Sequence, residues 1–252
     1  DVEPKNDIVK PNNALPGTHL PKTDTLYNFL RCLTTCHTVI REKDGTYRAE
    51  SPDELALVEG AAKLNCSVKE RGTVNMECQM FNEDQSYEVL AINAFNSERK
   101  RMSLILKNNK DEYFMMCKGA DNIMLPLCNI DDNKQTKIEK RLLELAQLGL
   151  RTLVIGQKKL DTNVAKEWLI EYSKCAASME DRSQKMDDCA AKLEMGMDLL
   201  GITAIEDRLQ DEVPEVIASL AEAGIVVWML TGDKEETAIN IGRSCNLVEE
   251  IG

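Results

Sequence analysis

The sequence lacks any hydrophobic stretch long enough to cross a bilayer, and its first residues show no signal-peptide pattern. Basic residues are also in the minority. There are 31 Lys and Arg against 43 Asp and Glu, which gives a formal net charge of −12 and a pI of about 4.8. An acidic surface repels phosphate backbones and anionic lipids, so we expect no nucleic-acid partner and no direct attachment to an anionic membrane surface.

Cysteine pairs of the metal-binding type are missing as well. The nine cysteines are an odd number, are scattered along the chain and form no CxxC motif. Cys32, Cys36 and His37 are the one local cluster, and no second pair of ligands accompanies it, so the spacing does not favour a zinc site. We expect nine reduced thiols in a cytosolic protein.

What the chain does contain is ordinary for a globular protein: 252 residues, 43% of them apolar and 29% charged. This length suits one large domain, or one domain and part of a second. The first 22 residues are rich in Pro, Asn and Lys and have few large apolar side chains, which is typical of a linker.

The stretch 87–120 predicts an antiparallel meander. Apolar residues alternate over 87–95, again over 102–106, and a third apolar run covers 113–117, with short polar turns between them. Phe95 ends the first strand, and Lys118 follows the third, next to Gly119 and Ala120. These residues could form a shallow pocket, in which the Phe95 ring stacks on a flat base and the Lys118 ammonium binds an anion. The ordinary alternative is a core phenylalanine and a solvated lysine.

The region before the meander predicts a helix, a hairpin and a second helix. Residues 25–38 have apolar side chains at helical spacing, and Asp44-Gly45 is a hairpin turn signal. Ser51 and Pro52 suit the N-cap and first position of a helix that runs to about residue 64. Glu54 either closes this cap as a capping box or accepts a hydrogen bond from a ligand amine.

After the meander a polar insert at 129–136 precedes an amphipathic helix at 137–148, with Gly149 as its C′ residue. Residues 150–155 predict a strand that carries Arg151 near its start, either as a surface residue or as part of a site. The stretch 161–197 predicts helix, broken near Ser183, whose Trp168 and neighbours pack into the core.

The last fifty residues change character. Residues 199–205 and 225–230 are continuous apolar runs, as in buried parallel strands, and helices are predicted at 214–223 and from about 234 to 245. Thr231, Gly232 and Asp233 follow the second run and open a helix, the position where phosphate-bearing ligands bind in parallel sheets. The alternative is a simple cap, with Asp233 as N-cap and Glu236 three residues later.

Seven sequence blocks together resemble the cytosolic catalytic part of a P-type ATPase, and within that family the type IV phospholipid flippases. The blocks occur in the family's order: CHTV (36–39), ESPDELALV (50–58), FNSERKRMS (95–103), KGAD (118–121), GLRTL (149–153), AIEDRLQDEVPE (204–215) and LTGDKEETAINIG (230–242).

The resemblance implies a linker at 1–23, an α+β nucleotide-binding domain at 24–197, with an antiparallel sheet flanked by helices, and part of an α/β haloacid-dehalogenase-like phosphorylation domain at 198–252. It implies that Phe95 stacks on adenine, Glu54 lies near the adenine amino group, Lys118 lines the pocket and Arg151 reaches the phosphates. It assigns lesser or related roles to the following residues: Ser97 and Thr152 at the nucleotide, Thr231, Gly232 and Asp233 at the phosphoryl group, and Asp207 and Arg208 at the hinge.

The resemblance further implies ATP as ligand, with magnesium bound through the nucleotide by ligands outside this chain. The family's DKTGT motif, whose aspartate is phosphorylated, and its GDGxND motif are absent from the sequence. We therefore expect a soluble fragment of a longer membrane ATPase, on the cytosolic face of the membrane, that binds nucleotide but is not itself phosphorylated. The expected partners of this chain are the other domains of the parent. Phospholipid would contact only the parent's membrane segments, and an accessory membrane subunit is a further possible partner.

Two other functions remain open from the sequence. The parallel unit near the C-terminus suits a haloacid-dehalogenase-like phosphatase, although the aspartyl nucleophile is missing. A binding module with a vestigial pocket is the third hypothesis, and the presence of Phe95, Lys118 and Arg151 argues against it.

Overall fold

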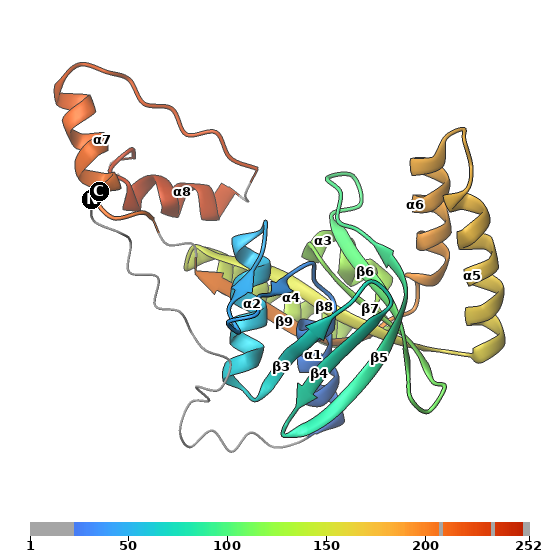
Figure 1. The fold of residues 1–252 in the computed structure, drawn as a ribbon. Coiled ribbons are helices and arrows are strands. Elements are labelled where there is room, and N and C mark those ends of the chain that lie inside the picture. Colours follow the sequence, from blue (N-terminus) through green and yellow to red (C-terminus); the bar gives the residue numbers. More distant parts are fainter. Residues whose placement is uncertain (1–22, 207–208, 233–234, 249–252) are drawn as a thin grey trace. The chain divides into compact units, whose positions relative to one another are not determined.

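The computed structural model describes residues 23–206, 209–232 and 235–248 (Figure 1). The predicted linker, apart from its last residue, lies outside this range, as do Asp207, Arg208 and Asp233. The chain forms two compact units, Asp1–Ile130 with Val154–Gly201, and Asp131–Leu153 with Ile202–Gly252. The domain boundary expected between residues 197 and 198 stays a prediction.

The helices and strands follow one another along the whole described chain. The helices are α1 (Asp24–Thr35), α2 (Pro52–Lys63), α3 (Asp121–Met124) with the 3-10 turn η1 (Leu125–Leu127), α4 (Asp132–Gln147), α5 (Thr162–Ala176), α6 (Arg182–Leu193), α7 (Val213–Glu222) and α8 (Glu235–Ser244). The strands are β1 (Ile40–Arg41), β2 (Tyr47–Arg48), β3 (Cys66–Arg71), β4 (Asn75–Met80), β5 (Glu83–Asn93), β6 (Arg101–Asn108), β7 (Tyr113–Gly119), β8 (Leu150–Leu160) and β9 (Asp198–Glu206).

The main sheet has seven strands in sequence order, β3 to β9, and each pairing from β3 with β4 to β7 with β8 is antiparallel. The predicted meander is therefore confirmed as β5, β6 and β7. The alternation predicted for β5 also holds, since Tyr87, Val89 and Ala91 are buried. Every residue of β7 is buried, so this strand lies in the centre of the core.

Helices cover different parts of the first unit's sheet. Helix α1 contacts β3, β4 and β7, and α2 contacts α1 and β3, whereas α6 contacts β5 and pairs with α5 (Figure 1). Thr23 begins α1 by accepting a hydrogen bond from the Leu26 amide at 3.2 Å. Ser51 is the N-cap of α2, with Pro52 in its first turn, as the sequence predicts. The antiparallel sheet flanked by helices is thus confirmed.

Helix α4, the first element of the second unit, begins earlier than the sequence predicts. Residues 129–136 were predicted as a polar insert, but α4 begins at Asp132 because the Asp131 side chain accepts a hydrogen bond from the Lys134 amide at 2.8 Å. Gly149 has φ +76° and follows the C-cap residue, as predicted. Helix α8 contacts α4, and the Asn240 side-chain amide donates to the Gln147 carbonyl at 2.8 Å.

Of the two predicted buried strands, 199–205 is found as β9 but is mostly not buried, and 225–230 is not a strand. Strand β9 is the last in the sheet order, and within it only Thr203 is buried. Residues 225–230 form no strand, and Val226, Trp228 and Leu230 are 78%, 84% and 95% exposed. An apolar run becomes a buried strand only where neighbouring strands and covering helices are available, and no described strand pairs with 225–230. None of the described helices has the length and apolar character of a membrane span.

Candidate functional site

Lys118 and Glu54 form a nearly buried ion pair at the end of β7. The Lys118 ammonium lies 2.7 Å from Glu54 Oε1, and the two side chains are 8% and 15% exposed. The Thr38 amide and hydroxyl donate to Glu54 Oε2 at 3.0 and 2.6 Å. Lys118 is therefore not the solvated lysine of the ordinary alternative, and the Glu54 carboxylate bonds to Thr38 and Lys118 rather than closing the helix cap.

Opposing effects determine the protonation of Glu54. Burial acts to raise the pKa of this carboxyl, but the charge of Lys118 and hydrogen bonds from Lys118 and Thr38 outweigh burial. The pKa of Glu54 consequently lies below its ordinary value. Glu54 thus stays ionised at neutral pH and offers a carboxylate beside the Lys118 side chain at one end of the sheet.

His37, next to Thr38 in the sequence, is held neutral inside the protein. Burial, followed by the nearby charge of Arg71, lowers its pKa to about 3. Its Nε2 lies 2.7 Å from the Thr34 carbonyl and its Nδ1 accepts the Val39 amide at 3.0 Å. These bonds fix the tautomer with hydrogen on Nε2 and occupy both ring nitrogens.

Phe95 lies just beyond the end of β5 and is 63% exposed, so it is not a core residue. Its ring borders an open hollow of about 460 Å³ between the end of β5 and helix α6. The hollow is lined by polar and apolar side chains from both elements: Ile92, Asn93, Ala94, Phe95, Asn96 and Arg99 from the strand end, and Arg182, Ser183, Met186 and Asp187 from α6. Ser97 is exposed in the same loop.

The predicted site residues therefore fall into separate groups. Glu54 and Lys118 are in direct contact, whereas Phe95 shares its hollow with residues of α6, and neither Glu54 nor Lys118 lines that hollow. Arg151 and Thr152 are half-buried at the start of β8 in the second unit. Thr231 and Gly232 are exposed ahead of α8 in that unit.

Comparison with known proteins gives a decisive match. The family model described as P-type ATPase, cytoplasmic domain N, matches residues 25–212. The chain belongs to this family. As the sequence blocks indicate, the similarity extends to phospholipid-transporting members of the family.

Three relatives show that the chain corresponds to a small part of much longer proteins. Phospholipid-transporting ATPase C887.12 of Schizosaccharomyces pombe is 42% identical over 238 residues, which is 92% of this chain and 19% of the relative. DRS2 of Saccharomyces cerevisiae is 43% identical over 88% of the chain and 17% of the relative. DNF1 of Chaetomium thermophilum is 41% identical over 88% and 15%, respectively. The chain thus spans less than a fifth of the length of these relatives.

Two further features of the N-domain chain are weaker candidates for a site. Glu171, Cys175 and Cys189 have ligand atoms within 4.8 Å of one another, the geometry of a possible metal site. However, Lys192 forms an ion pair with Glu171, and burial raises the pKa of Cys189 to about 11, which favours the thiol over the metal-binding thiolate.

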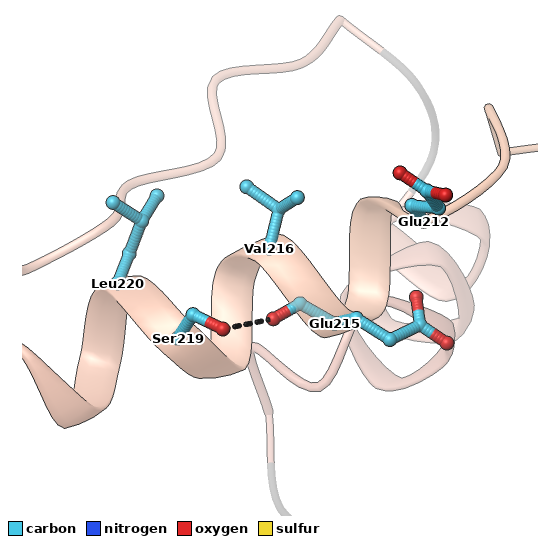
Figure 2. A pocket seen from close by; sticks show the side chains of 5 residues that line it. All are labelled: Glu212, Glu215, Val216, Ser219 and Leu220. Carbon is cyan, nitrogen blue, oxygen red and sulfur yellow. Dashed lines mark hydrogen bonds between the residues drawn. The ribbon is translucent and has the colours of Figure 1, made fainter.

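The second feature is a hollow on α7 lined by Glu212, Glu215, Val216, Ser219 and Leu220 (Figure 2). Figure 2 shows these side chains on one helix and its N-cap, with the Ser219 hydroxyl donating to the backbone carbonyl of Glu215 at 2.9 Å. The Ser219 hydroxyl is thus bonded within the helix, and the hollow contains none of the residues predicted to bind nucleotide.

Sequence reasoning missed several polar partners around both groups. Thr38 bonds to Glu54, and Arg71 lies 3.4 Å from Nδ1 of the neighbouring His37. Asp187 and Glu194 of the α6 region contact the loop that carries Phe95. Thr38 lies within the CHTV block (36–39), which is a usable signal. The others lie 34 or more residues from their partners, and no local pattern marks them.

Proposed function

We propose that this N domain binds ATP, with the adenine stacked on the ring of Phe95. The observation that carries the proposal is the exposure of this ring at the edge of a hollow, in a chain that belongs to a family of ATPases. A phenylalanine left 63% exposed presents a flat apolar face, and a purine would cover it. Family membership supports a nucleotide over other flat ligands.

The polar groups of the first unit supply the rest of the proposed recognition. In this proposal the Glu54 carboxylate accepts a hydrogen bond from the adenine amino group, Lys118 lines the pocket and Ser97 adds a hydrogen bond. Glu54 and Lys118 are already paired, so nucleotide would share these groups rather than meet an isolated charge. Their mutual pairing holds both groups in a nearly buried position, where they can share hydrogen bonds with a polar ligand.

In this proposal the phosphates of ATP are bound by residues of the second unit and by magnesium. Arg151 and Thr152 would meet the phosphates, and the phosphoryl group is assigned to Thr231, Gly232 and Asp233. Asp207 and Arg208 are assigned to the hinge. Magnesium would arrive with the nucleotide and take its protein ligands from outside this chain. Because phosphoryl transfer depends on positioning and charge neutralisation, binding the base far from the reacting phosphate lets binding energy favour domain closure.

We further propose that the parent protein is a phospholipid-transporting P-type ATPase, as the names of the relatives suggest. It would couple ATP hydrolysis, through an aspartyl phosphate formed outside this chain, to lipid movement between leaflets. Residues 24–197 are the proposed nucleotide-binding domain on the cytosolic face, and 198–252 the proposed part of a haloacid-dehalogenase-like phosphorylation domain. The parent's membrane segments would select the phospholipid, and an accessory membrane subunit is a further candidate partner.

Calorimetric titration of the chain with ATP tests the binding proposal. Phe95→Ala should weaken binding by about 1–3 kcal/mol, which is the range for loss of one stacked aromatic. Trp228→Ala is the matched control, because Trp228 is also a highly exposed aromatic but belongs to the second unit. Equal ATP affinity of the wild type and Phe95→Ala would disprove the assignment of Phe95, and absence of binding would disprove the function.

A second experiment tests whether the chain only binds nucleotide. The DKTGT motif is absent from the sequence, so incubation with γ-labelled ATP should leave no hydroxylamine-sensitive label on the protein. Acid-stable label that hydroxylamine removes would contradict this proposal.

A further inference from the structure

Glu194, the C-cap residue of α6, carries a carboxylate that is completely buried. A buried carboxylate is costly to desolvate, and its partners must compensate that cost. Two arginines do so: the Arg99 guanidinium contacts Oε1, and Arg101 Nε contacts Oε2 at 2.7 Å. The Ser103 hydroxyl also donates to Oε1 at 2.5 Å, so both carboxylate oxygens are satisfied.

All three partners of Glu194 belong to one short piece of chain that runs from the Phe95 loop into β6. Arg99 lies in the loop itself and is 7% exposed, and Arg101 and Ser103 are the first and third residues of β6. On the neighbouring strand, Asn93 donates from its amide to the Ser103 hydroxyl at 2.9 Å. Glu194 therefore binds the C-terminal end of the loop directly, and Ser103 connects it to Asn93 at the end of β5.

A second carboxylate, that of Asp187 in α6, contacts the same loop from about two helical turns before Glu194. Asp187 Oδ1 lies 3.5 Å from Arg99 Nε, and Asp187 Oδ2 accepts a hydrogen bond from the Asn96 side-chain amide at 3.1 Å. Inside the loop, Arg99 also donates to the Ala94 carbonyl at 3.2 Å. On either side of Phe95, the Ala94 carbonyl is thus linked to α6 through Arg99, and the Asn96 side chain is linked to it directly.

The network joins the two walls of the hollow beside Phe95. One wall is the strand end with its loop, and the other is α6, which contributes Met186 and Asp187. Burying an ion network adds little net stability compared with apolar packing, but its fixed hydrogen-bond directions define one arrangement of the loop. The distance between the walls, and so the space for a flat ligand, depends on these contacts.

We propose that Glu194, assisted by Asp187, is a positioning residue that sets the Phe95 loop against α6 and so shapes the nucleotide pocket. This inference rests on the proposed binding of ATP at Phe95. Glu194 does not touch the nucleotide. It acts through Arg99 and Arg101, whose orientation fixes the loop.

The test compares Glu194→Gln with Glu171→Gln in the full chain. Glutamine keeps the volume and the hydrogen bond from Ser103 but removes the charge that binds both arginines. Glu171 is a matched control, because it is also a helical glutamate paired with a cation, Lys192, but does not line the Phe95 hollow. Two quantities are measured: hydrogen exchange of the backbone amides of 96–101, relative to those of β7, and the affinity for ATP by calorimetry.

We expect Glu194→Gln to speed exchange in 96–101 while β7 stays protected, and to weaken ATP binding by about tenfold, within the range for losing one stacked base contact. Glu171→Gln should change neither quantity. Unchanged loop exchange in a folded Glu194→Gln protein overturns the inference, and so does a faster loop with unchanged ATP affinity.

Asp187→Asn is the second variant, for the case in which Glu194→Gln does not fold. Its side chain is 22% exposed, so the protein should tolerate the change, and loop exchange should again rise with a loss of ATP affinity of a few-fold. Wild-type affinity and exchange in this variant would overturn the inference. If the wild-type protein binds no ATP, the proposed function is refuted. Faster loop exchange in Glu194→Gln would then show only that Glu194 holds the loop, and the role in positioning a nucleotide site would be overturned too.

Discussion

The ion pair between Glu54 and Lys118 should contribute far more to stability than an exposed pair of similar geometry. At 2.7 Å the Coulomb attraction is at most about 6 kcal/mol for an effective dielectric constant of about 20. Desolvation of two side chains that are 8% and 15% exposed offsets much of this attraction. Glu54→Gln alone should therefore cost about 3 kcal/mol, because it leaves the Lys118 charge nearly buried without its partner.

A double-mutant cycle isolates the pair from other effects. Glu54→Gln, Lys118→Met and the double variant should show a coupling energy of about 2 kcal/mol, since the double variant leaves no uncompensated charge. The reference cycle uses Lys69 and Asp84, which lie 2.5 Å apart with side chains 37% and 72% exposed, and should show a coupling energy below about 1 kcal/mol.

Denaturant unfolding at pH 7, followed by tryptophan fluorescence, measures these energies. Trp168 is 5% exposed and reports unfolding of the first unit, whereas Trp228 is already 84% exposed in the folded protein. The pKa of Glu54 is lowered by folding from a reference value of 4.5, so the coupling should persist above about pH 4.5 and disappear as the pH falls through the folded-state pKa. Equal coupling energies for the buried and the exposed pair would refute this reasoning.

Two more predictions follow from buried positions. His37 has a folded-state pKa of about 3 against 6.5 when unfolded, so the unfolded chain binds the extra proton and stability should fall as the pH drops below 6.5. Between pH 7.5 and pH 5 the loss should be about 2 kcal/mol, and a His37→Gln protein that shows the same pH slope in denaturant titrations would contradict this. Gly119→Ala should destabilise strongly, because a Cβ there would lie 2.5 Å from Arg101 Cβ and 2.7 Å from the Lys100 carbonyl oxygen. Gly60→Ala in helix α2, with nothing within 4 Å, should instead raise the thermal midpoint, and a Gly119→Ala protein as stable as Gly60→Ala would disprove the steric argument.

Local sequence patterns were sufficient for the features that depend on neighbouring residues. The alternation in 87–95 predicted β5, Ser51 predicted the start of α2, and Gly149 predicted the end of α4. Periodicity and capping arise from side chains a few residues apart, so they can be recognised without the fold. The family blocks added the proposed ligand, which no period or cap could indicate.

Local patterns failed where a segment needed distant partners. The apolar run at 225–230 has the composition of a buried strand, yet it pairs with no described strand and its side chains are exposed. The early start of α4 was missed because residues 129–136 are polar, although Asp131 was available as a cap. Composition thus indicates what a segment can form, whereas available neighbours determine what it does form.

The sequence by itself determined the meander, most helix ends, the acidic character and the membership of a P-type ATPase domain. Only the tertiary structure decided that Lys118 pairs with Glu54, 64 residues away, and that Glu194 binds Arg99, 95 residues away. It also decided that Phe95 remains exposed while Lys118 is buried, although both lie close to the ends of strands in the same sheet. Burial and ion pairing depend on which elements cover each strand end, and packing between distant segments controls that cover.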